Sequence, residues 1–412
     1  MEFNGLLTPY RVLDLTEDPT ATCAKVLGDL GADVLKIERP GGDPCRNTGP
    51  FYHDNTSPEQ SLSWFAWNNS KRSITLNIET SDGQEIFKRL IESADFIIES
   101  FRPGYLSSLG LDYATLSKIN KHLIMTSITP FGQTGPYSLF KSSDLINMAL
   151  GGMMTLIGYP DRAPLRFSVE QSYIQAGTQA AAAASMALYY RHLEERGQHI
   201  DVSMQESVVA TTWTAQYYWG VTQTMTKRGG LGHKRGRVNT RMVFPCKDGF
   251  IIWGIIVAQQ GAKTRALIEL MEEEGMAGEL ANVEWEKRGL NEVLPEEMDH
   301  WNDMIASFFM THTKDELYEE AQKRGILLMP VCNFEDIASN EQLEYRSFWN
   351  PVYHPELDDT LIYPGIPFKS SEGDMKIKVR PPMMGEHNDD IYRGELGLSS
   401  EYLQNLRSKN VI

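Results

Sequence analysis

The first 150 residues alternate between short β-rich runs and helical patterns, and this alternation restricts the fold more than any other feature. The β-rich runs lie at Val12–Leu15, Val34–Ile37, Ser73–Leu76, Phe96–Ile98 and Leu123–Ile128. Helical patterns between several of them lie at Thr20–Leu30, Gly83–Glu92 and Tyr113–Ile119. Strand and helix in repetition indicate βαβ units on a mostly parallel sheet, so the predicted fold class is α/β. Ligands of such sheets bind beyond the carboxyl ends of the strands.

A long helix is predicted next, at about Ser172–Glu195, and it contains the alanine run Ala180–Ala184. Alanine is the best helix former, and its small side chain lets a neighbouring backbone approach closely. We therefore expect a buried helix that packs tightly against another element. A short strand at Ile200–Val202 and a helix at Met204–Tyr218 are predicted to follow.

The composition changes after about residue 220. Lys227–Thr240 is basic and rich in glycine, which is typical of a solvated loop. Phe250–Ile256 is predicted to be a strand, and residues 260–325 alternate helical patterns with acidic stretches. This middle part is predicted to form a smaller domain of its own, before a Pro-rich segment that begins near residue 345.

The charge balance excludes several kinds of partner. With 39 Lys and Arg against 55 Asp and Glu, the net charge is −16. A general nucleic-acid binder needs a basic surface, and so does a protein that docks on anionic lipid. A small anionic ligand stays possible, because a local cluster of cations can bind it. The amino terminus lacks the pattern of a signal peptide, and we expect a cytoplasmic protein.

Several familiar site motifs are missing from the sequence. We find no P-loop, no G-x-G-x-x-G after the first predicted strand, no H-E-x-x-H and no G-x-S-x-G. The nine histidines are dispersed without metal-ligand spacing, so no metal site is predicted.

Four turns at predicted strand ends carry Gly, Pro or basic residues instead, and three of the four contain Arg or Lys. They are Lys36–Arg46, Asn68–Ser73, Glu99–Gly104 and Pro130–Tyr137, the last followed by Lys141. Each basic residue alone could cap a helix or pair with a nearby carboxylate. Four such turns at corresponding strand ends favour an anionic crevice ligand, held by guanidinium and ammonium groups.

These same segments resemble a known family. The opening matches at Arg11–Thr16, Leu27–Glu38 and Gly42–Arg46, and further motifs match at Asn68–Leu76, Phe101–Gly104, Leu109–Leu111, Phe131–Tyr137, Arg191–Glu206 and Pro382–Asn388. The sequence resembles the class III (CaiB/BaiF-type) CoA-transferases, which include formyl-CoA transferase and carnitine CoA-transferase. The resemblance covers nearly the whole chain.

The resemblance implies a fold and a ligand. Family members have a large Rossmann-like domain interrupted by a smaller one, and two subunits interlace like chain links. Here that implies a first part of the CoA-binding domain at 1–220, a smaller α/β domain with linkers at 221–340 and a return segment at 341–412. Coenzyme A or an acyl-CoA is the implied substrate, with no metal. The implied CoA contacts are Arg39, Phe101, Arg102 and Lys141, with Lys71 and Arg72 as weaker candidates.

This chain differs from the family pattern at the position of the catalytic nucleophile. In the transferases an Asp attacks the acyl-CoA thioester and gives a mixed anhydride, which only a carboxylate can form and reopen. That Asp stands at the start of a long helix, four residues before a Gly. The residue four before Gly177 is Tyr173, and a shift of one residue gives Ser172. Glu170 is the nearest carboxylate, about 10 Å of extended chain earlier.

Three interpretations follow. In the first, this chain is the subunit without the nucleophile in a heteromeric CoA-transferase, paired with a homologous Asp-bearing subunit as a heterodimer or heterotetramer. The enzyme that moves CoA from succinyl-CoA to benzylsuccinate, in anaerobic toluene breakdown, is of that kind and is the one that we predict. In the second, the chain is self-sufficient and uses Glu170 as a relocated nucleophile. In the third, it binds CoA thioesters without chemistry.

Overall fold

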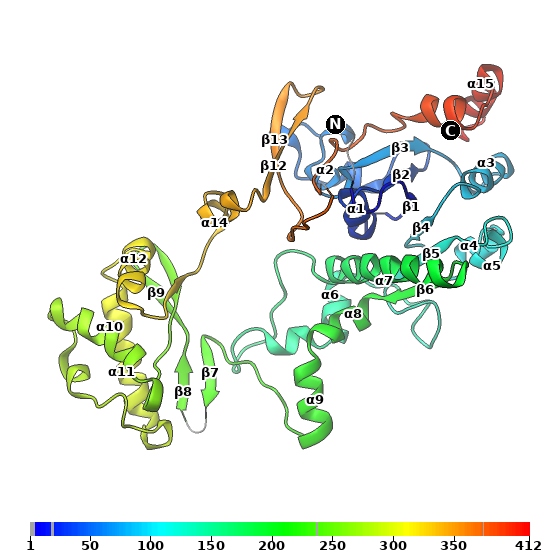
Figure 1. Ribbon diagram of the computed structural model, residues 1–412. Coiled ribbons are helices and arrows are strands. Elements are labelled where there is room, and N and C mark those ends of the chain that lie inside the picture. Colours follow the sequence, from blue (N-terminus) through cyan, green and yellow to red (C-terminus); the bar gives the residue numbers. More distant parts are fainter. Residues whose placement is uncertain (1–4, 18–19, 236–237, 374) are drawn as a thin grey trace. The chain divides into compact units, whose positions relative to one another are not determined.

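The computed structural model describes residues 5–17, 20–235, 238–373 and 375–412 (Figure 1). The chain divides into two compact units, each built from separate segments. The first unit comprises the chain up to Met153 together with Arg166–Tyr217 and Gln342–Ile412. The second unit comprises Met154–Leu165 and Tyr218–Glu341.

A parallel sheet of six strands forms the centre of the first unit. The strands are β1 (Arg11–Leu15), β2 (Asp33–Glu38), β3 (Lys71–Thr75), β4 (Phe96–Glu99), β5 (Ile124–Thr129) and β6 (His199–Ser203). Their order is β3-β2-β1-β4-β5-β6. The predicted α/β class and parallel sheet are therefore confirmed. The order reverses between β1 and β4, and at such a switch point doubly wound sheets open a crevice for a ligand.

Both faces of this sheet are covered. Successive strand side chains point to opposite faces, so Val12 and Leu13 of β1 enter different cores. Val12 packs with residues of α1 (Thr22–Asp29) and α7 (Ser172–Glu194). Leu13 packs in the core that contains α3 (Ser81–Ile91). Burial on both faces explains why consecutive residues of most strands are buried instead of alternating with exposed ones.

The alanine-rich helix packs as expected. The alanines of α7 at positions 176, 180, 181 and 184 are buried. A Cβ atom added to Gly177 would lie 2.6 Å from the Cβ atom of Thr22, so α1 and α7 approach closely at this glycine. The first unit also contains α2 (Leu62–Asn68), α4 (Tyr105–Ser108), α5 (Tyr113–Leu116), α6 (Asp144–Leu150) and α8 (Met204–Thr211).

Four predicted elements differ from the structure. The solvated loop expected at Lys227–Thr240 contains β7 (Gly232–Arg235) and most of β8 (Val238–Arg241), which pair antiparallel. The helix expected at Tyr113–Ile119 is only α5. The helix expected at Met204–Tyr218 is interrupted by the non-helical Thr212 (φ −112°, ψ 17°) and continues as α9 (Trp213–Thr222). The strand expected at Phe250–Ile256 is the shorter β10 (Gly249–Ile252), because its antiparallel pairing with β9 (Val243–Cys246) stops at the pair Ile252–Val243.

The second unit has its own core. Its strands are β7 (Gly232–Arg235), β8 (Val238–Arg241), β9 (Val243–Cys246), β10 and β11 (Met329–Pro330), and its helices include α10 (Ala262–Glu273), α11 (Pro295–Phe309), α12 (Lys314–Arg324) and α13 (Phe334–Ala338). Trp285 and Trp301 are buried in this core with their ring centroids 4.9 Å apart. An antiparallel sheet of β11, β10 and β9 contributes further residues.

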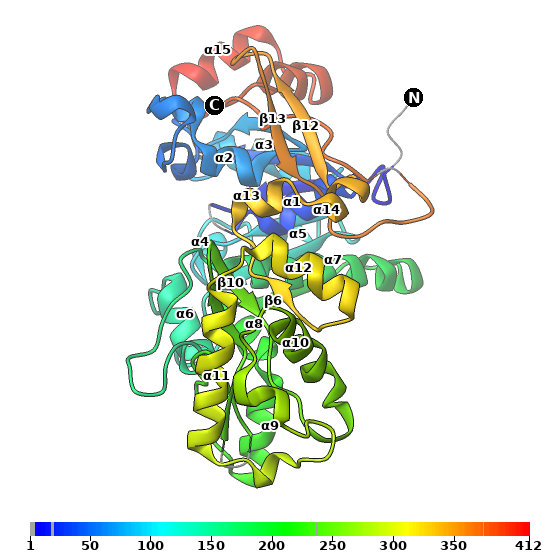
Figure 2. The same cartoon turned by 90° about the vertical axis from the view of Figure 1, so that its left-hand side faces the viewer.

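The carboxyl-terminal segment belongs to the first unit (Figure 2). It contains α14 (Glu341–Tyr345), the hairpin of β12 (Trp349–His354) and β13 (Asp359–Pro364), and α15 (Ser400–Ser408). Leu403 and Leu406 of α15 are buried in the same core as α3. The helices of the described residues include none that is long and apolar enough to cross a membrane.

Candidate functional site

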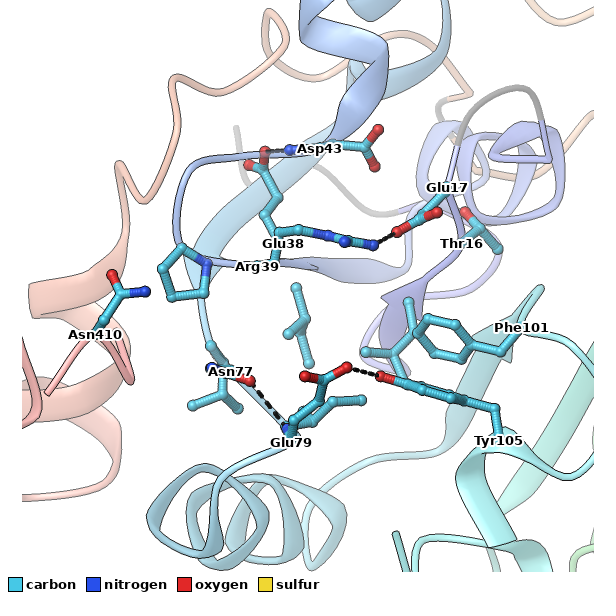
Figure 3. Close-up of a pocket in the computed structure, with 15 residues that line it drawn as sticks. Thr16, Glu17, Glu38, Arg39, Asp43, Asn77, Glu79, Phe101, Tyr105 and Asn410 are labelled. Atoms are coloured by element: carbon cyan, nitrogen blue, oxygen red, sulfur yellow. Dashed lines mark hydrogen bonds and ion pairs between the residues drawn. The ribbon is translucent and has the colours of Figure 1, made fainter. Parts of the chain in front are cut away.

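A pocket of ≈ 200 Å³ lies at the carboxyl ends of β1 to β4, next to the switch point of the sheet (Figure 3). The segments after these strands supply its walls. They contribute Thr16 and Glu17 after β1, Arg39, Pro40 and Asp43 after β2, Asn77, Ile78 and Glu79 after β3, Phe101 after β4, and also Tyr105 of α4 and Asn410. This is where a doubly wound sheet is expected to bind its ligand.

Arg39 follows the last residue of β2 and extends along the pocket wall. Its guanidinium forms an ion pair with the Glu17 carboxylate, which comes from the segment after β1. Both side chains are solvent-accessible, at 61% and 40%. Among the described residues that line the pocket, Arg39 carries the one guanidinium or ammonium group.

The residue before Arg39 points in a different direction. Glu38 is buried, and its carboxylate receives two hydrogen bonds from the Arg46 guanidinium, at 2.6 and 2.8 Å. The Ser73 hydroxyl donates a further hydrogen bond to it at 2.5 Å. Alternation along β2 thus directs Glu38 into the protein interior, while the next residue reaches the pocket.

Two aromatic side chains form the opposite wall. The ring centroids of Phe101 and Tyr105 lie 4.7 Å apart. The Tyr105 hydroxyl donates a hydrogen bond to Glu79 at 2.8 Å. Burial, together with the Glu79 carboxylate, raises the pKa of Tyr105 to about 12, so the hydroxyl stays a donor at neutral pH. The wall therefore offers an apolar face that suits a planar ring, and a polar edge.

A buried ionic network fixes the loops behind the pocket. Lys71 lies 2.8 Å from Asp14, and Lys36 lies 2.9 Å from Asp43. Asp14 also accepts hydrogen bonds from the N–H of Thr16 at 3.0 Å and from its hydroxyl at 2.6 Å. Burial opposes ionisation of Asp14, but the charges of Lys36 and Lys71 outweigh it and lower its pKa. Paired buried charges of this kind hold their loops in place, because separating them leaves a charge without a partner.

The structure brings only some of the predicted CoA contacts together. Arg39 and Phe101 line the pocket, whereas Arg102 and Lys141 are exposed residues outside its lining. Lys71 is buried against Asp14. Arg72 pairs with Asp33 at 2.7 Å and with Glu395 at 2.9 Å.

The placement of the second turn, Asn68–Ser73, was wrong. We expected it at the same edge of the sheet as the other three turns, but Lys71 begins β3 and the turn lies at the amino end. The position of a β-rich run along the chain does not show which of its ends carries the turn.

Sequence reasoning missed Glu17, Glu79 and Tyr105. The pocket lining includes the acidic residues Glu17, Glu38, Asp43 and Glu79, in contrast to the cationic crevice that we expected. The carboxylates of Glu38 and Asp43 are buried and pair with Arg46 and Lys36. Glu17 stands two residues after β1, so the rule that sites lie at strand ends could have identified it. In the described part of the chain, no group of three or more His, Cys, Asp or Glu side chains could hold a metal ion.

The start of α7 is the second place at which the family resemblance implies functional residues. Ser172 is fully buried. Its backbone N–H and its hydroxyl donate to the same oxygen of Asp144, at 2.7 and 2.9 Å, and the N–H of Gln171 donates to that oxygen at 2.8 Å. Tyr173 packs against the core beside α7, and Glu170 is exposed before the helix begins. A remote carboxylate therefore caps this helix, which the sequence pattern had not indicated.

Comparison with known proteins adds a family and several relatives. The model of CoA-transferase family III matches residues 7–388. The succinyl-CoA:(R)-benzylsuccinate CoA-transferase subunit BbsE of Thauera aromatica is 31% identical over 398 residues, covering 93% of this chain and 92% of that protein. The succinyl-CoA–L-malate CoA-transferase beta subunit of Chloroflexus aurantiacus is 32% identical, covering 98% of both chains.

A solved structure gives the same result for the fold. A CAIB/BAIF family protein from Brucella suis superposes with a TM-score of 0.83 at 28% identity. The match covers 95% of this chain and 99% of that chain.

Proposed function

The chain belongs to CoA-transferase family III, and we propose that it is the subunit without the nucleophile in a heteromeric enzyme that moves CoA from a thioester to a carboxylic acid. The observation that carries this proposal is the start of α7. The position four residues before Gly177, where the resemblance implies the nucleophilic Asp, holds Tyr173. A phenol does not form the anhydride that the carboxylate relay requires.

The neighbouring side chains do not replace that Asp. Ser172 is buried, and its hydroxyl donates to Asp144. The Asp144 oxygen that receives it also accepts two backbone N–H groups, so its lone pairs are already engaged in hydrogen bonds and it is a poor candidate for the attacking atom. Glu170 lies outside the helix, on the exposed chain before it.

A partner subunit is supported by the surface of α7. Four apolar side chains with the spacing i, i+3, i+4 and i+7 form an exposed stripe on this helix: Met186, Tyr189, Tyr190 and Leu193, which are 66%, 69%, 41% and 64% accessible. Contiguous exposed apolar surface of this kind marks an interaction site. Two relatives are named as subunits, which supports a homologous Asp-bearing chain as the partner.

CoA is proposed to bind at the switch-point pocket. Arg39 would bind a phosphate group, and the pair of Phe101 and Tyr105 offers a surface on which the adenine ring can stack. Arg102 and Lys141 remain proposals for the part of CoA outside this pocket. The interlaced dimer and the inserted smaller domain are also proposals, carried by the family resemblance.

The relatives guide the choice of substrates. By the name of the Thauera relative, we propose succinyl-CoA as donor and benzylsuccinate as acceptor. Glu170 as a relocated nucleophile remains the alternative, and its exposure leaves it accessible to a thioester. Binding of CoA thioesters without chemistry is the second alternative.

Reconstitution tests the proposal. The purified full-length chain should show no CoA transfer from succinyl-CoA. Co-expression with a family III homologue that carries the Asp should give an active complex, and Asp→Asn in that homologue should abolish its activity. Transfer by this chain alone, lost in Glu170→Gln, would instead support the relocated nucleophile.

A further inference from the structure

We infer that Glu17 competes with the ligand for the guanidinium of Arg39, so that a phosphate group of CoA binds by replacing Glu17 as its partner. This inference rests on the proposed CoA site and concerns its regulation. It starts from a contact inside the pocket, where the single Arg of the described lining already has an anionic partner.

The geometry makes the ion pair exchangeable. Arg39 and Glu17 are 61% and 40% accessible, so water and salt screen their attraction. The nearby pair of Arg46 and Glu38 is different, since its side chains are 1% and 0% accessible. A ligand can therefore displace Glu17 from Arg39, whereas the buried ion pair of Arg46 and Glu38 stays intact when the ligand binds.

Glu17 stays at the pocket after it has lost its partner. Its backbone N–H donates to the Ser100 hydroxyl at 3.2 Å, which ties the segment after β1 to the segment after β4. The carboxylate thus remains near the bound phosphate and repels it. A phosphate group offers more acceptor oxygens than a carboxylate, and a phosphomonoester also carries more charge, which favours the exchange in spite of this repulsion.

The competition has two measurable consequences. The affinity for CoA is lower than it would be if Arg39 had no partner in the free protein. Binding breaks the ion pair of Arg39 with Glu17 and forms one ion pair of Arg39 with the phosphate. The salt dependence of binding is also shallow, because the number of ion pairs at Arg39 does not change. Removal of the Glu17 charge should make binding both tighter and more sensitive to salt.

Calorimetric titration of the full-length chain with CoA, at low and high salt, tests the inference. Glu17→Gln should bind CoA about three- to tenfold more tightly at low salt. It should also lose more affinity than the wild type as salt is added. Glu92→Gln is the matched control, because it removes one exposed carboxylate from the opposite edge of the sheet, before β4, and should leave affinity unchanged.

A double variant separates competition from general repulsion. The effect of Glu17→Gln should disappear when Arg39→Gln is also present. An unchanged or weaker affinity in Glu17→Gln, or the same tightening without Arg39, would overturn the inference and leave the CoA site intact. Failure of the wild-type chain to bind CoA would overturn the proposed site together with the inference.

Discussion

One carboxylate oxygen of Asp144 accepts both the backbone N–H and the hydroxyl of Ser172, at 2.7 and 2.9 Å. This contact places a buried cap on α7 at the helix start where the family's nucleophile is expected. The cap gives the region a structural role that does not need an exposed carboxylate. It thereby agrees with a chain that keeps the fold but lacks the attacking group.

Removal of this cap should destabilise the first unit. In Asp144→Ala, the N–H groups of Gln171 and Ser172 lose their acceptor in a buried place, which predicts a loss of about 2–3 kcal/mol in the free energy of unfolding. Urea denaturation followed by circular dichroism measures it. Glu85→Ala, at an exposed position of α3, should change it by less than about 0.5 kcal/mol. Equal stability of the two variants would refute the capping role.

Glu99 should make stability fall as pH rises. Burial raises the pKa of this carboxyl from its ordinary 4.5 to about 7, although it accepts the N–H of Phe101 at 2.7 Å. The folded state therefore holds a proton that the unfolded state releases. The stabilisation is fully present below pH 4.5 and is lost as pH rises through 7.

Glu99→Gln removes this titration and keeps an oxygen that can accept the same hydrogen bond. Between about pH 4.5 and 7, the stability of the wild type should fall relative to the variant by about 2–3 kcal/mol. Urea denaturation at several pH values gives the difference. Parallel curves for the two proteins would show that Glu99 does not titrate in this range.

Lys71 and Arg72 should behave differently although they are neighbours. Lys71→Met leaves Asp14 without its 2.8 Å partner in the interior, which predicts a loss of about 3–5 kcal/mol in stability. Arg72→Gln removes the ion pairs with Asp33 and Glu395, in which the Arg72 side chain is 26% accessible. The free energy of unfolding should fall by about 1 kcal/mol or less. Thermal unfolding compares the two. A Lys71→Met protein of unchanged stability with weaker CoA binding would show that Lys71 contacts the ligand and would contradict its structural role.

The apolar stripe of α7 should be needed for assembly and not for folding. Tyr189→Glu puts a charge at a position that is 69% accessible, so the free energy of unfolding of the chain alone should change little. The same charge should prevent the association of the co-expressed subunits. Size-exclusion chromatography with light scattering measures the mass, and Ala114→Glu, at the exposed position of α5, is the control. A complex of normal mass would argue against this surface.

The sequence predicted the sheet because a buried strand leaves a local signature, a short run rich in β-branched and apolar residues that is bounded by helical patterns. All six strands came from such runs, including β6. The turns that contain Arg39 and Phe101 followed from the same pattern, since each residue comes directly or shortly after a strand. The choice of these two residues as CoA contacts came from the family resemblance.

The remaining features depend on contacts between distant residues. Lys71 meets Asp14 across 57 positions, and Ser172 meets Asp144 across 28, so no local pattern showed that the lysine is buried or that the helix is capped. The pairing of Arg39 with Glu17 is likewise a contact between two loops. We expected a crevice lined by several cations. Among the described residues that line it, only Arg39 is a cation, and Arg39 already pairs with Glu17.

The most direct test of the central claim is to find which subunit carries the covalent intermediate. The active complex would be incubated with succinyl-CoA, treated with hydroxylamine and digested, and the modified peptide identified by mass spectrometry. The account predicts a hydroxamate on the Asp of the partner subunit and none on this chain. A hydroxamate on Glu170 or Asp144 of this chain would contradict it.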